Sequence, residues 1–73
     1  PEARGRGVGR ALMEVIEEWA RARGLERVSL HAQTDALAFY RALGYREEGD
    51  VFDEAGIPHQ AMHKDVAPAP RRQ

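Results

Sequence analysis

Residues 4–10, RGRGVGR, stand near the start of the chain and lead directly into an amphipathic helical pattern. Glycine lets a backbone approach an anion closely because no Cβ intervenes. The N–H groups that open a helix have no partner within it, and the positive end of the helix dipole lies beside them. A glycine-rich segment at the start of a helix therefore predicts an anion site of the kind that holds phosphate groups.

The glycine spacing narrows the choice of phosphate. It differs from the dinucleotide-binding pattern G-x-G-x-x-G, and no acidic residue closes the following strand to bind a ribose. It also lacks the Gly-Lys-Ser/Thr ending of an ATP-type loop, which supplies a lysine for phosphate and a hydroxyl for magnesium. The pattern favours a pyrophosphate held without a metal. A glycine-rich turn that serves only tight packing is the other interpretation.

A long helix is predicted from residue 8 to residue 23. Its apolar residues recur at helical spacing, and we expect them, together with Met13, to face the core. Gly24 follows at the position that commonly ends a helix. The apolar stripe consists of Val8, Leu12, Val15, Ile16 and Trp19.

The next segments alternate between strand and helix patterns. Residues 27–33 alternate polar and apolar side chains and predict a strand. A short helix over residues 36–43 follows, with Thr34 or Asp35 as its N-cap and Gly44 at its end.

A hairpin is predicted in the last third of the chain. Residues 45–52 can form a strand that is weakened at 47–50, where we expect a bulge or an exposed edge. Residues 53–56 predict a turn. Residues 58–66 form the returning strand, with Pro58 in first place, where a missing N–H donor is tolerated. Residues 67–73 show no apolar periodicity and are expected to be a disordered tail.

Composition excludes several classes of function. The chain has 73 residues, no cysteine and a formal net charge of −1. A disulfide framework and a cysteine nucleophile are excluded within this segment. The near-neutral charge argues against nucleic-acid binding, and no apolar run approaches the length of a membrane span. Because no strand precedes the glycine segment, we expect residues 1–66 to be the C-terminal portion of a larger cytoplasmic domain.

A second motif extends from the first predicted strand through the short helix, with the pattern Gln33-x-x-Ala36-x-x-Phe39-Tyr40-x-x-x-Gly44-Tyr45. Together with residues 4–10, it closely resembles the GNAT family of acyl-CoA N-acyltransferases. The first motif is similar to that family's pyrophosphate-binding motif, and the second to its later CoA-contacting segment. Members usually carry Asn where this chain has Gln33. Residues 51–59, followed by Met62, resemble the ElaA-like branch.

The resemblance covers residues 1–66 and implies an α/β fold. It corresponds to the C-terminal part of a GNAT-like mixed sheet flanked by helices, in the order helix, strand, helix, strand, strand. Acetyl-CoA is the implied co-substrate, with no metal. Backbone amides of residues 5–10 are implied to bind its pyrophosphate, with added contacts from arginine side chains. The implied CoA-binding residues are Arg4, Gly5, Arg6, Gly7, Val8, Gly9, Arg10, Gln33, Ala36 and Phe39.

Tyr40 matches the family's tyrosine beside the CoA sulfur, which implies a general acid that protonates the departing thiolate. The other interpretation is a half-buried aromatic that packs beside Phe39. The implied reaction is direct acetyl transfer to a primary amine of a small molecule or peptide. A non-catalytic acyl-CoA or phosphate-binding module is the alternative. The family's thioester-polarising N–H lies on an upstream strand, so this segment is not expected to catalyse alone. Family members often pair, which also admits a homodimer.

The remaining polar residues have two interpretations. His31, His59 and His63 each titrate near neutral pH and are candidates for a base, although a structural role is the simpler one. His59 and His63 would lie about 13 Å apart along one strand face, too far to share a metal ion. The acidic segment over residues 47–54 either attracts a cationic amine or protects an edge strand, and the second is favoured.

Overall fold

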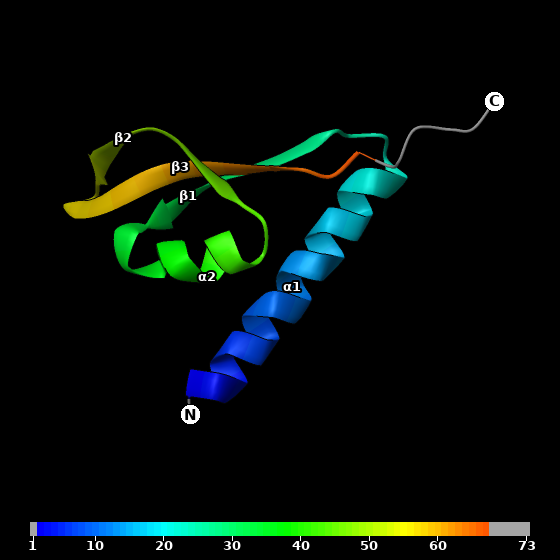
Figure 1. Ribbon diagram of the computed structural model, residues 1–73, viewed down its shortest axis with the longest axis horizontal. Helices are drawn as coiled ribbons and strands as arrows, with labels where there is room; N and C mark the ends of the chain where they lie inside the picture. Colours follow the sequence, from blue (N-terminus) through cyan, green and yellow to red (C-terminus); the bar gives the residue numbers. More distant parts are fainter. Residues whose placement is uncertain (1, 68–73) are drawn as a thin grey trace. The chain divides into compact units, whose positions relative to one another are not determined.

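The computed structural model describes residues 2–67, with side chains from residue 7 onward (Figure 1). The predicted order of helix, strand, helix, strand and strand is confirmed. No helix in this described part is both long enough and apolar enough to cross a membrane. The tail prediction falls mainly on residues 68–73, which lie outside the described residues. The elements are α1 (Glu2–Ala22), β1 (Arg27–Gln33), the 3-10 helix η1 (Thr34–Ala36), α2 (Leu37–Ala42), β2 (Arg46–Glu54) and β3 (Ile57–Asp65).

The chain divides into two compact units. One contains residues 1–28 and 65–73, and the other contains residues 29–64. The first unit holds α1 and the start of β1. The second holds the rest of β1, then η1, α2, β2 and most of β3. The glycine segment and Tyr40 therefore belong to different units.

Helix α1 begins at Glu2, so the prediction of a glycine loop before a helix starting at residue 8 is wrong. Residues 4–10 lie within the first turns of the helix. Each helical glycine costs about 1 kcal/mol relative to alanine. Extending an existing helix is much easier than nucleating one, so the helix that follows can carry these turns.

The end of α1 confirms its prediction. Gly24 has a φ of +76°, its N–H donates to the carbonyl of Arg21 at 3.0 Å, and the N–H of Leu25 donates to Ala20 at 2.9 Å. These two bonds form the Schellman motif, which satisfies carbonyls that the helix leaves open.

The apolar stripe of α1 is only partly buried. Met13 is buried as predicted, and so is Ala20, seven residues later. The prediction that Trp19 lies in the core is wrong, because its side chain is 53% exposed. The guanidinium of Arg23 lies 4.5 Å from the centre of the indole and covers part of it. The exposed apolar residues of this helix are Val8, Leu12, Val15 and Trp19.

The three strands form one sheet in the order β1-β3-β2, and Figure 1 shows α2 beside it. Strands β2 and β3 pair antiparallel through a two-residue turn, Ala55 and Gly56, with φ values of +54° and +78°. Positive φ at both positions is typical of a type I′ hairpin turn. Pro58 is the second residue of β3, opposite Asp53, rather than its first.

Strand β2 contains the predicted bulge and forms one edge of the sheet. Glu48 pairs with Ala61 and Phe52 with His59, so β2 carries two extra residues between these pairs. Gln60 holds the bulge in place. Its buried amide donates to the carbonyls of Glu48 at 3.2 Å and Gly49 at 2.7 Å.

The entry into α2 differs from the prediction. Thr34 and Asp35 belong to η1, and the N-cap position of α2 is Ala36, which makes no side-chain cap bond. The tight 3-10 turn takes the place of a capped start, because its bonds are made within the backbone. Gly44 ends the helix as predicted, with a φ of +99°.

Candidate functional site

Tyr40 lies in α2, and aromatic contacts hold its ring. The phenol meets the Phe39 ring at 5.0 Å and 80°, and the Tyr45 ring at 5.8 Å and 77°. Both are edge-to-face arrangements, which aromatic rings favour. Tyr45 is itself buried, and the Lys64 ammonium lies 5.7 Å from its ring centre. A ring held in this way fits both the packing interpretation and the general-acid interpretation of Tyr40.

The main chain at the end of α2 also constrains Tyr40. Its carbonyl accepts hydrogen bonds from the N–H groups of Leu43 and Tyr45, both at 3.0 Å. The backbone of Tyr40 is therefore tied to the turn that leads into β2. This turn sets where the phenol stands relative to the sheet.

An ion pair joins α2 to β2. Arg41 Nε donates to Glu47 Oε2 at 2.6 Å, and Arg41 Nη2 donates to the same oxygen. This hydrogen bond lowers the pKa of Glu47 below its usual value and raises the pKa of Arg41. Both side chains therefore stay charged together over a wide range of pH.

The other CoA-binding candidates of this unit follow one another along the chain. Gln33 is exposed at the end of β1, and Ala36 and Phe39 are half-buried in η1 and α2. Gln33 occupies the N-cap position of η1 without a side-chain cap bond. The strand-to-helix connection thus presents these residues together with Tyr40, as the second motif predicts.

The glycine segment lies in the other unit and is helical. The side chains of Arg4 and Arg6 lie outside the described ones. Arg10 Nε lies 3.4 Å from Glu14 Oε2 rather than standing ready for an anion. In a helix only the first four N–H groups lack a helical partner, so amides beyond Gly5 are engaged along α1. The role of residues 4–10 in binding CoA stays a prediction.

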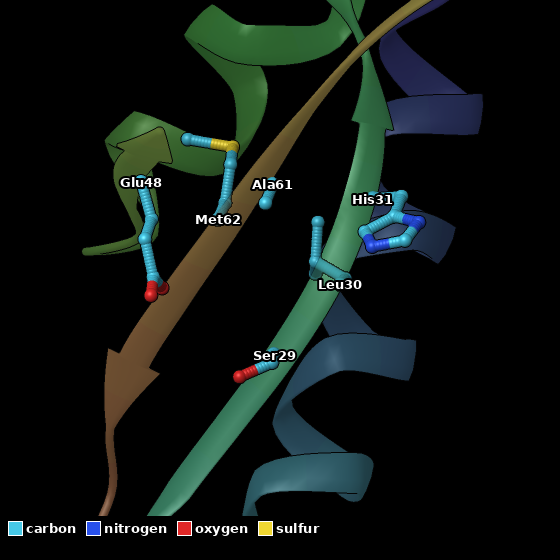
Figure 2. Close-up of a pocket in the computed structure, with 6 residues that line it drawn as sticks. All are labelled: Ser29, Leu30, His31, Glu48, Ala61 and Met62. Carbon is cyan, nitrogen blue, oxygen red and sulfur yellow. The ribbon is translucent and has the colours of Figure 1, made fainter. Parts of the chain in front are cut away.

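A pocket of about 350 Å³ lies on the sheet (Figure 2). All three strands contribute to it, and all its lining residues belong to the unit of residues 29–64. Its polar groups are a hydroxyl, an imidazole and a carboxylate, and the remaining residues are apolar. The lining residues are Ser29, Leu30, His31, Glu48, Ala61 and Met62.

Two cross-strand pairs of histidine and glutamate involve the lining of this pocket. His63 Nδ1 lies 3.0 Å from Glu48 Oε1, and His31 Nδ1 lies 3.2 Å from Glu54 Oε1. Each carboxylate orients an imidazole, and the tautomer follows from the side chain it faces. Among residues 2–67, no three His, Asp or Glu side chains are grouped so that they could hold a metal ion.

An aromatic row continues along the same strands. The ring of Phe52 meets His31 edge-to-face at 5.0 Å and stacks with His59 at 6.1 Å and 28°. His59 Nδ1 also lies 2.8 Å from the carbonyl oxygen of Ile57. Sequence reasoning treated the three histidines singly and missed these partners. Strand alternation was the available signal, but the bulge hides which residues of β2 face them.

Comparisons with known proteins agree with this arrangement. Residues 1–66 match the family model described as the acetyltransferase (GNAT) domain. The chain is 43% identical over 63 residues to the N-acetyltransferase YjcF of Bacillus subtilis, covering 85% of this chain and 45% of that protein. It is 56% identical over 43 residues to N-alpha-acetyltransferase 80 of Mus musculus, covering 59% of this chain and 13% of that protein.

A solved structure shows the same fold. The acyl-CoA N-acyltransferase from Pseudomonas aeruginosa is 34% identical, with a TM-score of 0.74, over 80% of this chain and 40% of that one. The chain spans less than half the length of each of these relatives. The narrower likeness of residues 51–59 to the ElaA-like branch stays a prediction.

Proposed function

Because the chain belongs to the acetyltransferase (GNAT) domain family, we propose that the protein is an N-acetyltransferase that moves an acetyl group from acetyl-CoA directly to a primary amine. The amine nitrogen attacks the thioester carbon, and the carbon–sulfur bond breaks. The amine loses a proton, and the departing CoA thiolate gains one. A proton donor and a deprotonated amine are therefore the two requirements of the step.

Tyr40 is the proposed proton donor. Its support is the family match, which includes the whole second motif, and the two ring contacts that hold the phenol. A positioned general acid typically contributes about 10²- to 10⁴-fold to the rate. The Arg41–Glu47 pair, beside Tyr40 in sequence, ties α2 to the following strand and so supports the position of the phenol.

The start of α1 is the proposed pyrophosphate site. Its support is the family match, the positive end of the helix and the arginines of residues 4–10. With α1 starting at Glu2, the unpaired N–H groups are those of residues 2–5, and the later glycines become available only if the first turns open. We expect bound acetyl-CoA to favour such an opening.

The proposal is tested by the release of free thiol. The full-length protein is mixed with acetyl-CoA and a panel of primary amines, and CoA thiol is measured with time. The expected result is thiol release that depends on both protein and amine. CoA binding without thiol release from any amine would show a non-catalytic acyl-CoA-binding module instead.

A further inference from the structure

The pocket on the sheet is shaped by one small residue between two longer ones. His31 on β1, Ala61 on β3 and Glu48 on β2 lie on the three strands in their spatial order. Ala61 pairs directly with Glu48, and its methyl group leaves open space that a larger side chain would fill. The pocket has a volume of about 350 Å³, at the small end of ligand sites in proteins.

One full negative charge lines this space. Glu48 is 59% exposed at its side chain, and His63 Nδ1 lies against Oε1 at 3.0 Å. This contact fixes the carboxylate through one oxygen. A carboxylate accepts up to four hydrogen bonds, so Glu48 retains capacity to accept more from a ligand.

The backbone beneath Glu48 is also fixed. The amide of Gln60 donates to the carbonyls of Glu48 and Gly49 and holds the bulge from which the Glu48 side chain emerges. Gln60 is 6% exposed, so solvent does not compete strongly for these bonds. The carboxylate is thus aimed by its backbone and by His63.

The remaining lining suits an apolar stem. Leu30, Ala61 and Met62 contribute hydrocarbon, while Ser29 adds a hydroxyl and His31 an imidazole (Figure 2). His31 itself is oriented by Glu54 and by the ring of Phe52. An apolar space with one fixed carboxylate matches a ligand that has a cation at the end of a narrow hydrocarbon chain.

We propose that this pocket binds a primary ammonium group on an aliphatic stem, with Glu48 as its counter-ion and His63 as the residue that positions Glu48. The identification of this ligand as the acetyl acceptor rests on the proposed N-acetyltransferase function, whereas the binding site itself does not. The same ligand chemistry is presented by a free alkylamine and by a lysine side chain.

Binding is measured first without acetyl-CoA. NMR titrations of the full-length protein with n-butylamine, Nα-acetyl-lysine amide and n-butanol give three dissociation constants. We expect at least one of the two amines to bind and n-butanol to bind at least about tenfold more weakly, because a charged hydrogen bond is lost. The tighter amine identifies the source of the stem. Equal binding of n-butanol and the amines, or no binding of either amine, would overturn the proposal.

Three variants locate the site. Glu48→Gln is expected to weaken amine binding about tenfold. Its matched control is Asp50→Asn, which removes the same charge from the same strand outside the pocket, and a change below about twofold is expected. Ala61→Leu fills the pocket and should also abolish binding. Equal effects of the Glu48 and Asp50 variants, or unchanged binding in Ala61→Leu with a native thermal transition, would contradict the assignment.

Turnover separates this inference from the proposed function. If the amine is the acceptor, Glu48→Gln raises its KM about tenfold and leaves the KM for acetyl-CoA unchanged. An active enzyme whose amine KM is unaffected by Glu48→Gln would overturn the inference and leave the transferase function intact. Glu48-dependent amine binding by a protein that never releases thiol would do the reverse.

Discussion

The phenol of Tyr40 stands at the point where α2 turns into β2, and its ring touches two other aromatic rings. The motif that contains it was recognisable from sequence because its residues lie within a short segment. The ring contacts with Tyr45 were not, because they depend on the turn at Gly44. The residue was therefore predictable, but its environment was not.

Tyr40→Phe tests the role of this hydroxyl. The variant keeps the ring contacts and removes the proton donor, so we expect kcat to fall about 10²- to 10⁴-fold with the KM for acetyl-CoA unchanged. Steady-state and single-turnover rates of the full-length protein provide the measurement. Tyr45→Phe makes the same chemical change on the neighbouring ring and should leave kcat near the wild-type value. An unchanged single-turnover rate in Tyr40→Phe would leave the residue with only its packing role.

The glutamates of β2 show what residue types alone do not reveal. The acidic segment predicted an exposed edge strand, and β2 is indeed an edge. Its members nevertheless have different partners: Glu47 meets Arg41, Glu48 meets His63 and Glu54 meets His31. These pairings follow from the bulge and the strand order, which a single sequence does not specify.

At the scale of the elements, the joint between α2 and β2 has a defined dependence on pH. The pKa of Glu47 is lowered in the native state, chiefly by the hydrogen bond from Arg41. The stabilisation is therefore present above the unfolded-state pKa of about 4.3 and is lost as the pH falls through the lower native pKa.

Glu47→Gln should accordingly destabilise the protein at pH 7 and have less effect at about pH 3. Urea denaturation of the variant and the wild type at both pH values measures the difference. Asp50→Asn, on the same strand, is the control for general charge effects. A destabilisation by Glu47→Gln that is equally large at both pH values would argue against the ion pair as its cause.

Helix α1 is the element whose start the sequence predicted wrongly. Three glycines favoured a loop, whereas the helix begins at Glu2 and includes them. Its end at Gly24 was predicted correctly, because a positive φ at this position strongly favours glycine. Glycine thus marks a helix end more reliably than it excludes a helix start, where its cost of about 1 kcal/mol is easily offset.

Gly7→Ala distinguishes a ligand-binding glycine from a merely tolerated one. A Cβ at Gly7 meets no atom within 4 Å, so alanine should stabilise α1 by about 0.5–1 kcal/mol. If the first turns open around CoA, the same change should weaken CoA binding, as calorimetry on the full-length protein can show. Ala11→Gly, which destabilises the same helix, controls for helix stability. Tighter or unchanged CoA binding in Gly7→Ala would indicate that the glycine does not hold the pyrophosphate.

At the scale of the whole molecule, the two family motifs lie in different compact units. Residues 4–10 belong to one unit, and Gln33, Tyr40 and the pocket belong to the other. The chain spans less than half of the relatives named above, so its activity is assigned to the full-length protein. The order of elements was predictable from periodicity and turn residues. The pocket was not, since it requires three strands in register.

The most direct test of acetyl transfer is the appearance of the acetylated amine itself. The full-length protein is incubated with acetyl-CoA carrying an isotope-labelled acetyl group and with a primary aliphatic amine, and the amine is examined by mass spectrometry. The account predicts that label appears on the amine in the wild type and is greatly reduced in Tyr40→Phe. Unlabelled amine after prolonged incubation with every amine tested, despite saturating acetyl-CoA, would contradict it.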